Sequence, residues 1–162
     1  PLANLLLVQV VQNVFVSGEL EYVGRAYASG NVLVAALATF KQNFFTATLL
    51  TGILPSLIFP FWEVFKNFLS FSILGFAMSP IWADRIPGYT YHSITVVMEL
   101  EAYILAAFII SAWPLRILDA FRSGEVRHIG WGLTVVASGT VLVALILFAA
   151  ALYEATTLIL LS

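Results

Sequence analysis

Long apolar runs separated by short polar breaks dominate this chain. Four of them, residues 43–62, 64–82, 92–113 and 131–153, are about 20 residues long, the length that an α-helix needs to cross a bilayer. Only Lys66, Glu99 and Glu101 are charged within these runs. A tryptophan lies at or beside one end of each run, where its amphipathic ring prefers the headgroup level. The pattern predicts an all-α, polytopic membrane protein with about four to five transmembrane helices.

Prolines interrupt the first two runs. Pro55 and Pro60 lie in the first run, and Pro80 lies near the end of the second. Each interior proline removes a helical hydrogen bond and bends the axis, and in lipid the freed carbonyl needs a partner inside the protein. We therefore expect residues 43–82 to form a kinked helical hairpin that turns around residues 63–66.

Residues 1–42 are expected to form short or interfacial helices. Residues 2–16 are apolar but interrupted by Gln9, Gln12 and Asn13, and they are short for a full crossing, so they form either the end of a span or an interfacial helix. Residues 18–40 begin polar and become apolar from Val32, which predicts a helix that rises from the interface into the membrane. No basic segment followed by a cleavage site opens the chain, so we expect no removable signal peptide.

Residues 114–130 form the only basic connection between apolar runs. By the positive-inside rule this loop is expected in the cytoplasm, with Lys66 on the same side. Ile117, Leu118 and Phe121 alternate with charged residues at helical spacing, which predicts a short amphipathic helix along the cytoplasmic surface. We expect residues 1–162 to form a single integral membrane domain, and we place it in a prokaryotic inner membrane.

The composition excludes several functional classes. Hydrophobic residues make up 61% of the chain and charged residues 10%, against about 25% charged in soluble domains, so a soluble enzyme is excluded. The net charge of −2 and the lack of a basic tract give no support for nucleic-acid binding. The chain has no cysteine, two histidines and no catalytic or phosphate-binding motif, so we expect no enzyme activity, no cofactor and no metal.

Glu99 and Glu101 are the most informative side chains, because a carboxylate at mid-helix in a membrane costs roughly 2.5–3.5 kcal/mol. Two residues correspond to about 200° around a helix, so these carboxylates point to opposite sides. His92 lies seven residues before Glu99 and shares its face. The first interpretation is that Glu99 is protonated or hydrogen-bonded to another helix and locks the bundle. There are two alternatives. In the first, a proton or cation path runs along this face. In the second, the span begins later and both acids lie among the lipid headgroups.

Other polar and small residues are candidates for contacts between helices. Asn43 and Asn67 lie near the starts of the first two runs, where an amide can cap a helix or bridge neighbours. Small residues recur at helical spacing in the last two runs, which favours close packing of these two helices. These small residues are Ala102, Ala106, Ala107, Ser111, Gly132 and Gly139.

The order of several motifs resembles the stage II sporulation protein M family of integral membrane proteins. The motifs are Asn-Phe-Phe-Thr-Ala at 43–47, Gly-Ile-Leu-Pro at 52–55, Asn67 with Gly75, Met-Glu-Leu-Glu-Ala at 98–102 and Ala-Leu-Tyr-Glu-Ala at 151–155. The resemblance covers residues 39–156. It matches Glu99 and Glu154 to family glutamates, whereas Glu101 has no counterpart. Tyr-His-Ser at 91–93 replaces the Pro-His-Gly block that typically opens the acidic span in that family.

The resemblance implies a membrane anchor and scaffold that gathers other proteins. The first hypothesis is therefore a non-enzymatic membrane subunit that contacts the lipid bilayer and assembles with other integral membrane proteins in a larger complex. The alternatives are a small proton or cation transporter or channel subunit using Glu99 and Glu101, and an accessory subunit of an energy-converting complex.

Overall fold

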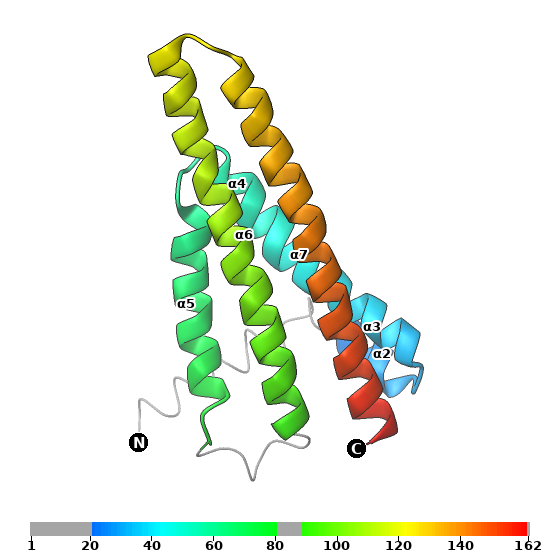
Figure 1. The fold of residues 1–162 in the computed structure, drawn as a ribbon. Coiled ribbons are helices and arrows are strands. Elements are labelled where there is room, and N and C mark those ends of the chain that lie inside the picture. Colours follow the sequence, from blue (N-terminus) through cyan, green and yellow to red (C-terminus); the bar gives the residue numbers. More distant parts are fainter. Residues whose placement is uncertain (1–20, 81–88, 162) are drawn as a thin grey trace.

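The computed structural model describes residues 21–80 and 89–161, and over these ranges it contains helices and no strands (Figure 1). Within the described part, three helices are long and apolar enough to cross a membrane: Val32–Ser56, Tyr89–Ser123 and Arg127–Leu160. The predicted class, an all-α membrane protein with several spans, is confirmed at this level. The helix expected within residues 2–16 lies outside the described residues.

Two short helices open the described chain. Helix α2 (Glu21–Ala28) ends before Gly30, whose φ of +66° is left-handed, and α3 (Val32–Phe40) follows directly. Asn31 caps α3, because its side-chain oxygen accepts hydrogen bonds from the backbone N–H groups of Leu33 and Val34 at 3.0 and 3.1 Å. The helical structure predicted for residues 18–40 is confirmed over the described residues 21–40, with a break at this cap.

The first long helix continues from α3 through a π-helical segment, η1 (Lys41–Ile53), into α4 (Leu54–Ser56). The span therefore begins at Val32 and ends at Ser56, earlier at both ends than the predicted residues 43–62. In a regular helix the N–H of residue 55 would donate to the carbonyl of Thr51, and Pro55 has no such N–H. The indole N–H of Trp62 donates to this carbonyl at 2.8 Å, so the freed group finds its partner inside the protein.

The chain reverses at residues 57–61 and enters α5 (Trp62–Ala77). The sequence predicted this turn at residues 63–66. It lies earlier in the chain, because the helix stops just after Pro55 and Phe61 adopts a left-handed φ of +66°. Trp113 of the next helix donates its indole N–H to the carbonyl of Leu57 at 3.3 Å. Glu63 and Lys66 consequently belong to α5 and lie within the protein.

Helices α6 (Tyr89–Ser123) and α7 (Arg127–Leu160) form a long antiparallel hairpin (Figure 1). The short amphipathic helix predicted around Ile117, Leu118 and Phe121 is not a separate element, because α6 continues through Pro114 to Ser123. Arg116 stacks on the Trp131 ring of α7, with its guanidinium carbon 4.1 Å from the ring centroid. The segment thus packs against α7. Gly124, with φ of +73°, follows the end of α6.

Small side chains bring α6 and α7 together. Ala102 and Ala106 of α6 are fully buried, and a Cβ on Gly139 of α7 would lie only 2.4 Å from Ile109 Cδ1. A Cβ on Gly132 would lie 3.0 Å from Arg116 Cβ. The helix Val32–Ser56 runs obliquely behind this pair in Figure 1. It adds Phe44 and Ile53 to the same apolar core, and a second cluster joins Ala35 and Ala36 of α3 to Ala155 of α7.

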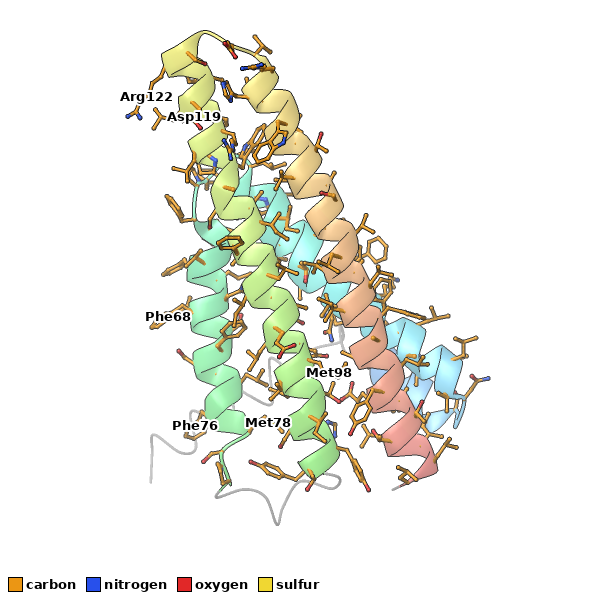
Figure 2. The ribbon with its side chains drawn as sticks, viewed as in Figure 1. Phe68, Phe76, Met78, Met98, Asp119 and Arg122 are labelled. Carbon is orange, nitrogen blue, oxygen red and sulfur yellow. The ribbon has the colours of Figure 1, made fainter. Side chains whose placement is uncertain are left out.

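Large apolar side chains cover the outside of the bundle, while several polar groups are buried inside. Phe68 on α5 is 69% exposed and points away from the bundle in Figure 2, and Phe108 on α6 is 77% exposed. Glu63, Asn67 and Thr48 are buried. This distribution is the reverse of that in a water-soluble protein and suits a hydrocarbon surrounding.

Gly139→Val is expected to lower the free energy of unfolding by about 1–3 kcal/mol, because the added carbons overpack the contact with Ile109. Titration with sodium dodecyl sulfate in mixed micelles, followed by far-ultraviolet circular dichroism, measures the loss. A second change, Ile109→Ala, should make the double variant lose less than the sum of the two single losses. Gly75→Val on α5 is the control, since no described atom lies within 4 Å of a Cβ there. An equal loss at Gly75 contradicts this explanation.

Candidate functional site: a polar cleft among five helices

A cleft of about 530 Å³ lies among α2, α3, η1, α6 and α7. Its lining combines two carboxylates, an imidazole, two amides, two hydroxyls and apolar groups. The lining residues are Val23, Gly24, Tyr27, Thr39, Gln42, Asn43, His92, Glu99, Glu154 and Leu158. Met98, which Figure 2 labels on α6, is the chain neighbour of Glu99. Its position shows that the cleft lies in the half of the α6–α7 hairpin that is away from the turn. The structure therefore gathers here polar residues separated by up to 127 positions in the sequence, from Tyr27 to Glu154.

Asn43 and Glu99 connect η1 to α6 at the wall of the cleft. The Asn43 side-chain amide donates a hydrogen bond to Oε1 of Glu99. An amide at position 43 could cap a helix or bridge two helices. Asn43 lies within the helix Val32–Ser56 and not at its start, and its side chain bridges two helices. This hydrogen bond matches the first interpretation of Glu99, in which the acid is joined to another helix.

His92 and Glu154 connect α6 to α7 on the same side of the cleft. His92 Nδ1 lies 3.0 Å from Oε1 of Glu154, and the two side chains are 31% and 16% exposed. His92 and Glu99 share one helix face, in agreement with their spacing of seven residues, and both line the cleft. Glu154 was marked only by the family resemblance, because no periodicity within one helix indicates a contact between residues 92 and 154.

Tyr27 closes the cleft from α2. Its hydroxyl lies 3.3 Å from Oγ1 of Thr39. Burial raises the pKa of the Tyr27 hydroxyl well above its usual range, and the nearby charge of Glu154 adds to this rise. The Tyr27 hydroxyl is therefore neutral. The Tyr22 hydroxyl, one turn earlier, donates to the side-chain oxygen of Gln42 at 3.1 Å and holds α2 on η1.

Glu101 lies apart from this site. It is exposed and does not line the cleft, whereas Glu99 two residues earlier does. The two carboxylates thus point to different sides of α6, as the angle of about 200° between them predicts. Any chemistry that needs two carboxylates in the cleft must use Glu99 with Glu154.

A second polar cluster joins η1 to α5. Glu63 is fully buried, and its Oε2 and Oε1 lie 2.8 and 3.0 Å from Nζ of Lys66. Lys66 also donates to the carbonyl of Ala47 at 2.5 Å. The Glu63 backbone N–H donates to Oγ of Ser56 at 2.8 Å, and Asn67 donates to the carbonyl of Tyr103 on α6 at 3.0 Å. Sequence reasoning assigned the Glu63–Lys66 pair to a turn, although opposite charges three residues apart inside an apolar stretch do signal a possible buried pair.

The cleft can bind by charge and hydrogen bonding, because its lining combines carboxylates, amides and hydroxyls. The described residues contain no group of three or more His, Asp or Glu side chains that could hold a metal. Glu99 and Glu154 both line the cleft. A proton or another cation between them would reduce their mutual repulsion.

No family model, curated protein or solved structure matches the chain. The likeness to the stage II sporulation protein M family thus stays a hypothesis that rests on the motifs quoted above.

Proposed function

We propose that this chain is a non-enzymatic subunit of a membrane complex, which assembles with other integral membrane proteins as a scaffold or accessory component. The observation that carries this proposal is the outer face of α5. Trp62, Phe65 and Phe68 are 41%, 56% and 69% exposed on it. Such aromatic side chains bury large apolar areas when a partner helix packs on them. The resemblance to a family of membrane scaffolds supports the same function.

We further propose that α5 crosses the membrane as a fourth span, paired with Val32–Ser56 in a hairpin kinked near Pro55. Its 16 residues extend over about 24 Å. The end of the α6–α7 hairpin carries Arg116, Arg122 and Arg127, and we place it in the cytoplasm of a prokaryotic cell by the positive-inside rule. Residues 1–162 would then form one domain of the inner membrane.

Mild detergent extraction from native membranes, followed by native mass spectrometry, tests the subunit proposal. We expect a stable complex with at least one other membrane protein. Replacing Phe65 and Phe68 by alanine should release that partner, whereas Phe108→Ala, which removes a more exposed ring from α6, should not. A chain that is always recovered alone, or equal release by the Phe108 variant, contradicts the proposal.

The polar cleft favours a second candidate function, a transporter or channel subunit driven by protons or cations. Ionisable residues inside a membrane bundle commonly mark such paths, and here Glu99 and Glu154 are brought to one cavity with His92. In reconstituted vesicles Glu99→Gln should abolish flux while the circular dichroism spectrum stays unchanged. Glu101→Gln, on the exposed face, should keep the wild-type flux. Absence of flux in the wild-type protein contradicts this candidate.

A further inference from the structure

The cleft has room for a ligand larger than an ion. Its volume of about 530 Å³ lies within the range of about 300–1,000 Å³ that small-molecule sites occupy. A single water takes up about 30 Å³ in the liquid, so a proton or a bare inorganic ion would leave most of this space to solvent. The cleft is therefore large enough for an organic ligand with a body of several carbon atoms.

The charges of the lining select a cation. Glu99 and Glu154 contribute two carboxylates, and the lining supplied by the described residues includes no lysine or arginine. His92 pairs with Glu154 and balances at most one of them. Asn43 donates a hydrogen bond to Oε1 of Glu99, and the Glu99 side chain lines the cleft. An ammonium group with several N–H donors fits this acceptor.

The remaining walls suit the carbon skeleton of such a molecule. Val23 of α2 and Leu158 of α7 supply apolar surface, and the Tyr27 ring lies in the same lining. An aromatic face attracts an organic cation by about 0.5–2 kcal/mol, depending on how fully the contact is desolvated. The lining therefore offers an acidic part and an apolar, aromatic part within one cavity.

We propose that this cleft binds a small organic ammonium ion, whose charged group is held by Glu99 and Glu154 and whose carbon chain contacts Val23, Tyr27 and Leu158. The inference refines the second candidate function by naming its ligand class. It does not depend on the subunit proposal, because a membrane subunit can hold such a ligand without transporting it.

The test uses the whole chain in nanodiscs made of phosphatidylcholine and phosphatidylglycerol, with butylammonium as the probe. Isothermal titration calorimetry is expected to show saturable binding. Butanol and butyrate have the same carbon chain without the positive charge and should not bind. Glu99→Gln should weaken butylammonium binding at least tenfold, and Glu101→Gln, which removes an equal charge from the opposite side of α6, should leave it unchanged.

Three results would overturn the proposal: equal binding of butanol, unchanged binding in the Glu99 variant, or an equal loss in the Glu101 variant. The circular dichroism spectrum of each variant shows that it folds. If Glu99→Gln unfolds, Tyr27→Leu replaces it as the test variant, and it should weaken binding of butylammonium at least threefold. Proton or sodium flux without butylammonium binding would reject the ligand class while leaving the second candidate function in place.

The bound ammonium group could belong to a soluble amine or to a lipid headgroup, and nanodisc composition separates these sources. If phosphatidylethanolamine in the bilayer lowers the apparent affinity for butylammonium, the site takes a lipid headgroup. If it has no effect, the site takes soluble amines. Either outcome supports the ammonium site and assigns its source.

Discussion

Lys66→Met is expected to lower the free energy of unfolding by about 3–5 kcal/mol, because it leaves the Glu63 carboxylate buried without its positive partner. The Glu63 side chain is fully buried and that of Lys66 is 17% exposed, so little water can replace the lost ammonium group. The carbonyl of Ala47 loses a donor as well. Detergent titration followed by circular dichroism measures the change in stability.

Two controls make this result specific to the buried pair. The double variant Glu63→Gln and Lys66→Met removes both charges at similar volume and should recover most of the loss, because replacement of a whole buried pair is often close to neutral. Lys41→Met makes the same substitution at an exposed position that contacts the Tyr22 ring, and it should cost under about 1 kcal/mol. A double variant as unstable as Lys66→Met contradicts the role given to the pair.

The helical class and the long spans could be predicted from hydropathy, because each span carries its own signal within about 20 residues. The run at residues 131–153 lies wholly inside α7 and the run at 92–113 wholly inside α6. Their ends were less predictable. Arg116 and the other charges after Pro114 looked like a surface segment, but the contact with Trp131 keeps that segment helical and packed on α7.

The turn after the first span was misplaced for a related reason. In a sequence, Glu63 and Lys66 look like residues that must face water, since their cost in lipid is large when each is considered alone. The structure removes this cost by pairing them with each other and with backbone groups of η1. Hydropathy assigns one value to each residue and cannot register such a pair.

The candidate cleft was only half visible in the sequence. The shared face of His92 and Glu99 follows from helical periodicity within α6. Their partners come from other helices: Asn43 lies 56 residues before Glu99, and Glu154 lies on α7. Contacts of this kind depend on how helices are placed in three dimensions, which the periodicity of one segment does not determine.

The π-helical segment η1 connects the two polar clusters. Asn43, near its start, contacts the cleft, and Gly52, near its end, lies against the Glu63–Lys66 pair. Within η1, the Thr48 hydroxyl donates to the carbonyl of Asn43 at 2.7 Å, five residues earlier. Such segments are rare and occur often at functional sites. A disturbance at Gly52 can therefore reach the cleft through one continuous helix.

Gly52→Ala tests this end of η1 and should lower the free energy of unfolding by about 3–5 kcal/mol. Its Cβ would lie 1.8 Å from Oε2 of Glu63 and 2.8 Å from Nζ of Lys66, so the pair must separate and lose its compensation. In the background Glu63→Ala and Lys66→Met the added methyl group has room, and the same substitution should cost under about 1 kcal/mol. Detergent titration of the four proteins gives this coupling energy directly. An equal cost in both backgrounds would mean that Gly52 is needed for the π-helical backbone itself and not for the space that it leaves to the ion pair.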